Sequence, residues 1–108
     1  MWGICLDCST AGGSLFQRAV EYQLDSEAHT ANILQPVKIA ISADKMMTVD
    51  KPPVFVYGDL VSPINHHDRI GRIETIIWHF KNEDYCYYIT VNGRKISKRY
   101  YTEELMKI

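Results

Sequence analysis

The chain has few cysteines, no long apolar run and no surplus of charge of either sign. Its three cysteines are an odd number in 108 residues, which argues against a secreted disulfide scaffold and favours a reducing compartment. No stretch approaches the roughly 18 apolar residues that a transmembrane helix needs, and the first residues lack the basic region of a secretory signal. We therefore expect a cytoplasmic protein with no membrane partner.

Charge and composition exclude little else. The formal net charge is −1, so the whole-chain basic signature of nucleic-acid binding is missing. Hydrophobic residues make up 46% and charged residues 23%, which is ordinary for a globular protein. The length suits one domain, or a small domain with an extension, and no repeat is evident in the residues.

The N-terminal half shows helical spacing followed by strand alternation. Apolar residues recur at steps of four, and no Gly or Pro occurs from Ser14 to Gln35, so we predict a helix from Ser14 to about His29. Val37–Ala43 alternates and predicts a strand. Pro52-Pro53 marks the best internal boundary, which separates an extension, 1–53, from a second unit, 54–108. The residues that carry the helical spacing are Phe16, Val20, Leu24 and Ala28.

The C-terminal half reads as a series of strands. In Gly71–Arg99, two runs rich in Ile, Val, Tyr and Trp flank the polar break Lys81–Asp84, and Asn92-Gly93 precedes a basic segment. Asn-Gly is the preferred dipeptide of a type I′ hairpin turn, so this stretch predicts a three-stranded meander. Five short strands in about 55 residues, the last preceded by one helical turn at 102–104, favour a small closed barrel. The other strands are expected at 54–61, 95–101 and near Leu105 and Ile108.

Three segments resemble known small barrels. Tyr57–Val61 resembles the opening "G-D-x-V" strand of SH3-like barrels, including the Tudor and KOW types, and Ile70–Ile73 resembles their second strand. Tyr100–Ile108 resembles their closing turn and strand. The runs Trp78–Lys81 and Val91–Tyr100 further resemble small uncharacterised bacterial proteins, some of them similar to immunity proteins of polymorphic toxin systems. The resemblance covers about residues 54–108 and implies a protein partner, such as a toxin domain.

The expected fold is therefore α+β and mainly β. An N-terminal helix and one strand would pack on a C-terminal five-stranded SH3-like barrel. Nine of the twelve aromatic residues follow residue 53, more than a barrel of this size can bury. We expect several of these rings on the outer surface, where they either cover the helix or form an exposed binding patch.

Basic residues crowd the last predicted strands. Alternation puts Lys95 and Arg99 on one face and Arg94 and Lys98 on the other. With the neighbouring rings, these cations would contact an acidic protein surface, where Arg and Tyr are the usual anchors. They would alternatively grip a phosphate backbone while rings stack on bases. The predicted partner-binding residues are Trp78, His79, Tyr87, Tyr88, Arg94, Lys95, Lys98, Arg99 and Tyr100.

Two further motifs carry possible chemistry. Cys5 and Cys8 form a C-x-x-C pair, but a structural zinc site needs four ligands and no second pair is present. His66-His67-Asp68 offers acid–base groups without a recognisable nucleophile. We predict no catalytic site, metal or cofactor, and the sequence carries no signal of oligomeric state. The predicted function is a non-enzymatic protein-interaction module, an immunity-type inhibitor; the alternatives are a nucleic-acid-binding barrel that uses strand 94–101 and an enzyme built on the His66-His67 loop.

Overall fold

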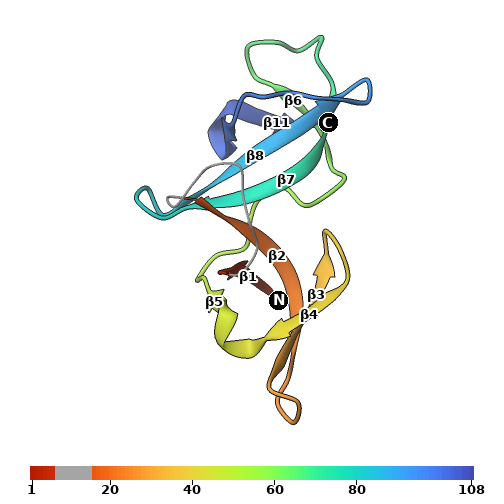
Figure 1. The fold of residues 1–108 in the computed structure, drawn as a ribbon. Helices are drawn as coiled ribbons and strands as arrows, with labels where there is room; N and C mark the ends of the chain where they lie inside the picture. The colour runs from red at the N-terminus through yellow and green to blue at the C-terminus, as the bar shows by residue number, and fades with distance from the viewer. Residues whose placement is uncertain (7–15) are drawn as a thin grey trace.

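The computed structural model describes residues 1–6 and 16–108. This described part is built from β-strands and two 3-10 turns, and its strands join into one curled antiparallel sheet (Figure 1). The strands are β1 (Trp2–Cys5), β2 (Phe16–Asp25), β3 (Thr30–Gln35), β4 (Ile39–Ser42), β5 (Met46–Thr48), β6 (Leu60–Pro63), β7 (Gly71–His79), β8 (Asp84–Val91), β9 (Arg94–Lys95), β10 (Tyr100–Tyr101) and β11 (Leu105–Lys107). The turns are η2 (Ala43–Lys45) and η3 (Thr102–Glu104).

The predicted N-terminal helix is wrong, and with it the α+β class. Strand β2 and the hairpin to β3 occupy the residues from 16 onward that the helix was to fill, so the described part of the chain is all-β. Steps of four keep side chains on one face of a strand as well as of a helix, because four is also a multiple of two. Tyr22 distinguishes the observed strand from the predicted helix, because it is buried two residues after the buried Val20. Leu24, in contrast, is 52% exposed.

The described part of the chain contains two units with a similar order of elements, in which β9 and β10 of the second take the place of β4 of the first. In the first, β2, β3 and β4 form a meander, η2 follows, and β5 returns to pair with β1. In the second, β7 and β8 form a hairpin, β9 and β10 both pair with β8, η3 follows, and β11 returns to pair with β6. The structure therefore repeats although the residues show no repeat.

Matching positions support this correspondence. Gly3 of β1 pairs with β2 on one side and β5 on the other, just as Val61 of β6 pairs with β7 and β11. The residue before β3, His29, has φ 55, and the residue before β8, Glu83, has φ 50. The predicted boundary at Pro53 falls between β5 and β6, where the two units meet.

Strand β2 joins the units. It pairs with β1 and β3 in its own unit and with the end of β7 in the other, with Phe16 opposite His79 and Arg18 opposite Ile77. Figure 1 shows this long strand running from the lower lobe to the upper one. The largest buried cluster also crosses the boundary, since it packs Ile4 and Ala19 with side chains of β7 and β8. The result is an elongated body of 48 × 26 × 22 Å.

Most C-terminal elements lie where the sequence predicts them. Strands β7 and β8 and the turn η3 match the meander and the helical turn. Asn92 has φ 53 and Gly93 has φ 76, which is the conformation of the predicted type I′ turn. The strand expected at 54–61 is shorter and begins at Leu60, and the one expected at 95–101 is split into β9 and β10.

Candidate functional site

Four of the nine predicted partner-binding residues are buried. Tyr87 is fully enclosed, Tyr100 is 3% exposed, and Trp78 and His79 are less than a tenth exposed. The ring of Tyr87 meets Phe55 edge-on at 5.2 Å, and its hydroxyl accepts a hydrogen bond from Thr102 at 3.3 Å. Tyr87 and Tyr100 therefore serve the core and offer almost no surface to a partner.

None of the nine C-terminal aromatic residues is exposed, so of the two expectations for these rings the described residues favour cover by the N-terminal segment. The N-terminal strands supply the cover that was expected from a helix: Trp2 stacks on Tyr57 with ring centroids 6.0 Å apart, and the Tyr57 hydroxyl donates a hydrogen bond to the carbonyl of Ala19. Burial raises the pKa of Tyr57. Of the nine C-terminal rings, those of Phe55, Trp78, Tyr85, Tyr87 and Tyr100 are buried, and those of Tyr57, Phe80, Tyr88 and Tyr101 are half-buried.

The remaining predicted residues gather mainly on one face of the β7–β8 hairpin, opposite the main core. We call it the basic–aromatic face. The strand register creates it, because Phe16 lies opposite His79, Lys95 opposite Thr90 and Tyr101 opposite Cys86. Its floor is a buried cluster of Phe16, Ile77 and Cys86. The face is defined by Phe16, His79, Tyr88, Lys95, Arg99 and Tyr101.

Two cations on this face lie over aromatic rings. The Arg99 guanidinium carbon is 4.1 Å from the centre of the Phe16 ring, and Lys95 Nζ is 5.1 Å from that of Tyr88. Lys98 instead lies 5.0 Å above Tyr100 and 3.6 Å from Glu104. Lys98 thus lies over another ring than Lys95 and Arg99 do, and Arg94 is exposed at the hairpin end.

Polar contacts hold the edge of the basic–aromatic face. The Asn82 amide donates to Tyr101 Oη at 3.1 Å, and its backbone N–H donates to His79 Nδ1 at 3.1 Å. His79 also meets Phe16 edge-on at 4.5 Å. Beneath them, burial raises the pKa of the Cys86 thiol to about 11, so the thiol is protonated at neutral pH and is a poor nucleophile.

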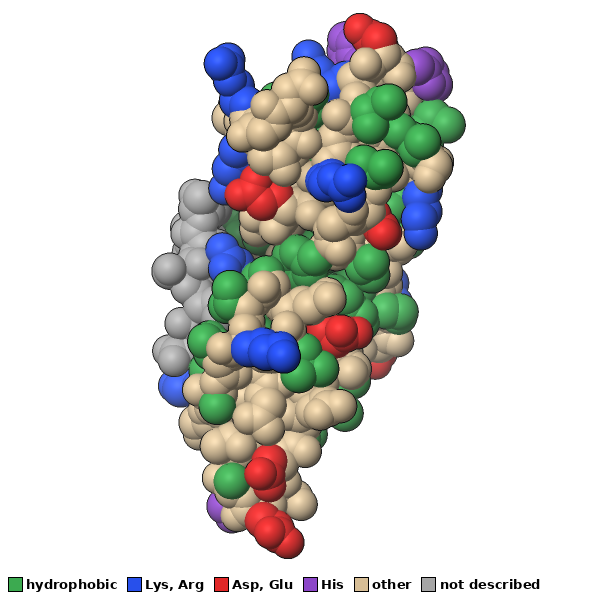
Figure 2. Space-filling model, turned by 90° about the vertical axis from the view of Figure 1, so that its right-hand side faces the viewer, with side chains coloured by type: hydrophobic (Ala, Val, Ile, Leu, Met, Phe, Trp, Pro, Cys, Tyr) green, Lys and Arg blue, Asp and Glu red, His purple; other side chains and the backbone are tan. Residues whose placement is uncertain are grey.

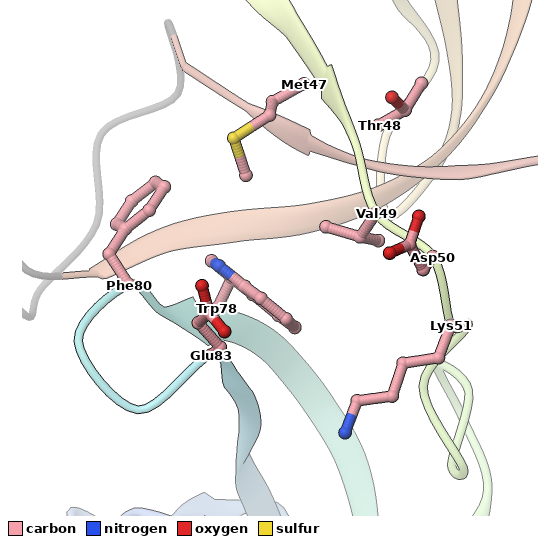
Figure 3. A pocket seen from close by; sticks show the side chains of 8 residues that line it. All are labelled: Met47, Thr48, Val49, Asp50, Lys51, Trp78, Phe80 and Glu83. Atoms are coloured by element: carbon pink, nitrogen blue, oxygen red, sulfur yellow. The ribbon is translucent and has the colours of Figure 1, made fainter.

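A cleft of about 420 Å³ lies where the two units meet, and we call it the inter-unit cleft (Figure 3). One wall comes from β5 and the segment after it, and the other from the end of β7 and the following turn. Tyr85 ties these walls together, because its hydroxyl donates to the Lys51 carbonyl at 2.6 Å and its ring meets Trp78 edge-on at 4.9 Å. The lining residues are Met47, Thr48, Val49, Asp50, Lys51, Trp78, Phe80 and Glu83.

Sequence reasoning found only Trp78 of this cleft. The available signal was local: Trp78 and Phe80 alternate at a strand end, and the acidic Glu83 follows. The wall from residues 47–51 could not be found in this way, because it meets residues 78–83 only through the tertiary structure. Phe16 was likewise expected on the buried side of a helix and not beneath the guanidinium of Arg99.

The other predicted motifs form no site in the described residues. Cys5 is fully buried and disulfide-bonded, and Cys8 lies outside the described residues. His66 and His67 are exposed in a loop, where Ser62 Oγ donates to the His66 carbonyl at 3.1 Å. Within residues 1–6 and 16–108, no three His, Cys, Asp or Glu side chains come together as metal ligands. None of the helical segments in this part has the length and apolarity to cross a membrane.

Comparison with known proteins places the chain in a family. Residues 18–106 match DUF6960, a family of unknown function, and the chain belongs to this family. The match begins in β2 and ends in β11, so it includes most of both units. No curated protein and no solved structure matches the chain.

Proposed function

We propose that the protein is a non-enzymatic protein-interaction module of the cytoplasm, an immunity-type inhibitor that binds an acidic surface of a toxin domain through its basic–aromatic face. The observation that carries this proposal is the pair of cations held over rings on one face, Arg99 on Phe16 and Lys95 on Tyr88. Arg and Tyr are the residues that most often anchor protein interfaces.

The held cations suit protein binding for an entropic reason. A long side chain that already lies over a ring loses less rotamer freedom when a partner binds, so more of the contact energy contributes to affinity. Ring contacts of this kind contribute about 0.5–1 kcal/mol at exposed sites. The floor of Phe16, Ile77 and Cys86 is buried, which keeps the rings beneath the cations in place.

The same geometry weighs against nucleic acid, the alternative function. Binding to single strands uses free ring faces on which bases stack, but Lys95 and Arg99 lie over the rings of Tyr88 and Phe16. Lys98 is near Glu104 and faces Tyr100, so it adds little to the charge of this face. On the side drawn in Figure 2, hydrophobic side chains are mixed with charges of both signs.

Affinity capture with a charge-reversed variant tests the proposal. The tagged protein should recover a protein from lysate of its host, and co-expression should protect cells from that protein. The double variant Lys95→Glu/Arg99→Glu should lose both effects. Lys38→Glu/Lys45→Glu changes the net charge equally, at two exposed lysines of the first unit. This control variant should still recover the partner and protect cells. Recovery that is equal for both double variants would refute a role for this face.

A binding assay with nucleic acid decides the alternative. Fluorescence anisotropy with a labelled single-stranded oligonucleotide should show no binding at low salt. If it shows binding that weakens steeply as salt rises from about 50 to 200 mM, the phosphate contacts of the alternative are present and the proposed function is wrong.

A further inference from the structure

We infer that the inter-unit cleft is a binding site for the basic side chain, arginine or lysine, of a peptide segment. The cleft is separate from the basic–aromatic face, because Trp78 and His79 are adjacent on β7 and point to opposite faces of the strand. Binding at the cleft therefore does not depend on the proposed function of the basic–aromatic face.

The size and walls of the cleft suit one long side chain. Its volume of about 420 Å³ lies within the usual range of ligand sites. Figure 3 shows Trp78 in the middle of the cleft, with Met47 and Phe80 on one side and Val49 on the other. The methylene stem of a lysine or arginine packs well against such apolar walls, while its charged end stays at the polar rim.

The charges at the rim select a cation. Asp50 and Glu83 are exposed carboxylates among the lining residues. Among the described lining residues Lys51 alone is basic, and its Nζ lies 3.7 Å from Asp84, so its charge is partly offset. An incoming anion would meet two carboxylates, and a neutral apolar group would partly desolvate them without compensation.

An aromatic wall and a carboxylate together are a strong combination for a cation. Trp78 lines the cleft although it is only 8% exposed, and an indole is the best ring for a cation–π contact, to which the rim carboxylates would add an ion pair. Glu83 comes from the turn after β7, on the wall that carries Trp78, whereas Asp50 lies on the wall that carries Val49. A basic group between them would contact the ring and be near both carboxylates.

An NMR titration of the full chain tests the inference. The probe is Nα-acetyl-arginine N-methylamide, and the readout is the indole N–H signal of Trp78. The arginine probe should shift this signal to saturation, with a dissociation constant on the order of millimolar. The lysine analogue should do the same, and the norleucine analogue, which lacks the charge, should bind at least about tenfold more weakly. Trp2 stacks on Tyr57 and does not line the cleft, so its indole signal should stay in place.

Variants at the rim separate the site from non-specific attraction. Asp50→Asn/Glu83→Gln should weaken binding of the arginine probe about fivefold, because each exposed pair contributes little on its own. Glu27→Gln/Glu74→Gln removes the same charge at exposed positions that do not line the cleft, and should bind as the unchanged protein does. Equal binding of arginine and norleucine probes, no shift of Trp78, or equal loss in both variants would overturn the inference.

Discussion

At the scale of the residue, Tyr85 is the clearest link between the two units. Its side chain is 2% exposed, its ring packs on Trp78, and its hydroxyl donates to the carbonyl of Lys51 across the inter-unit cleft. Burial raises the pKa of this hydroxyl to about 12. Because this buried phenol stays protonated in the folded state, the free energy of unfolding changes with pH in the alkaline range.

We predict that the free energy of unfolding falls as the pH rises from about 10 to 12. Below the unfolded pKa of about 10 both states hold the proton, so the contribution of Tyr85 is complete. Above it the unfolded state releases the proton first, and near pH 11 the loss amounts to roughly 1 kcal/mol. Urea unfolding at pH 8, 10 and 11 measures this change.

Tyr85→Phe is the matched variant for the pH series. It should lose about 1 kcal/mol at pH 8, because the Lys51 carbonyl loses its hydrogen bond, and it should show a shallower decline above pH 10. The decline should not vanish, since burial also raises the pKa of Tyr57 and Tyr87. A decline as steep as that of the unchanged protein would contradict the assignment to Tyr85.

At the scale of the element, strand β2 shows where sequence reasoning failed and why. Phe16, Val20 and Leu24 fit both a helix and a strand, and the absence of Gly and Pro left both possible. The partners that select the strand, β1, β3 and β7, are supplied by three separate segments of the chain. Local spacing could not reveal them, so neither the strands that cover the rings nor the inter-unit cleft was predictable, although cover of the rings by the N-terminal segment was one of the two expectations.

The β7–β8–β9 meander was predictable because its signals are local. Alternation along a strand also predicted that Lys95 and Arg99 share a face, and both lie over rings of the basic–aromatic face although residues 96–99 between β9 and β10 are not in a strand. The Asn92-Gly93 turn is the sharpest of these signals, since both residues have positive φ.

The turn predicts unequal effects for two substitutions. Gly93→Ala should cost about 1 kcal/mol of unfolding free energy, because φ is 76 and an L side chain is strained there. The added methyl would meet nothing within 4 Å, so the cost comes from the backbone alone. Asn92→Gly keeps positive φ accessible and should change stability by less than about 0.5 kcal/mol. Urea unfolding compares the two, and an equal cost would contradict this account of the turn.

At the scale of the whole molecule, two units of similar element order share a single sheet and a single main core. Ile4 and Ala19 of the first unit pack in the same cluster as Tyr87 and Ile89 of the second. Strand β2 also covers the end of β7, which would otherwise be an open edge with unpaired backbone groups. Loss of either unit therefore exposes core side chains and backbone of the other.

We predict from this shared core that the two units unfold together. The two tryptophans belong to different units, Trp2 to β1 and Trp78 to β7, and both pack in or against the shared core. In the single-tryptophan variants Trp2→Phe and Trp78→Phe, urea unfolding followed by fluorescence should give the same midpoint as far-UV circular dichroism of the same variant. Separate midpoints for the two probes within one variant would mean that the units are independent.

A chain of residues 54–108 gives a second test. If the units are independent, it should fold alone. With a shared core it should lack a cooperative transition, because Tyr57 and Trp78 lose the cover of β1 and β2.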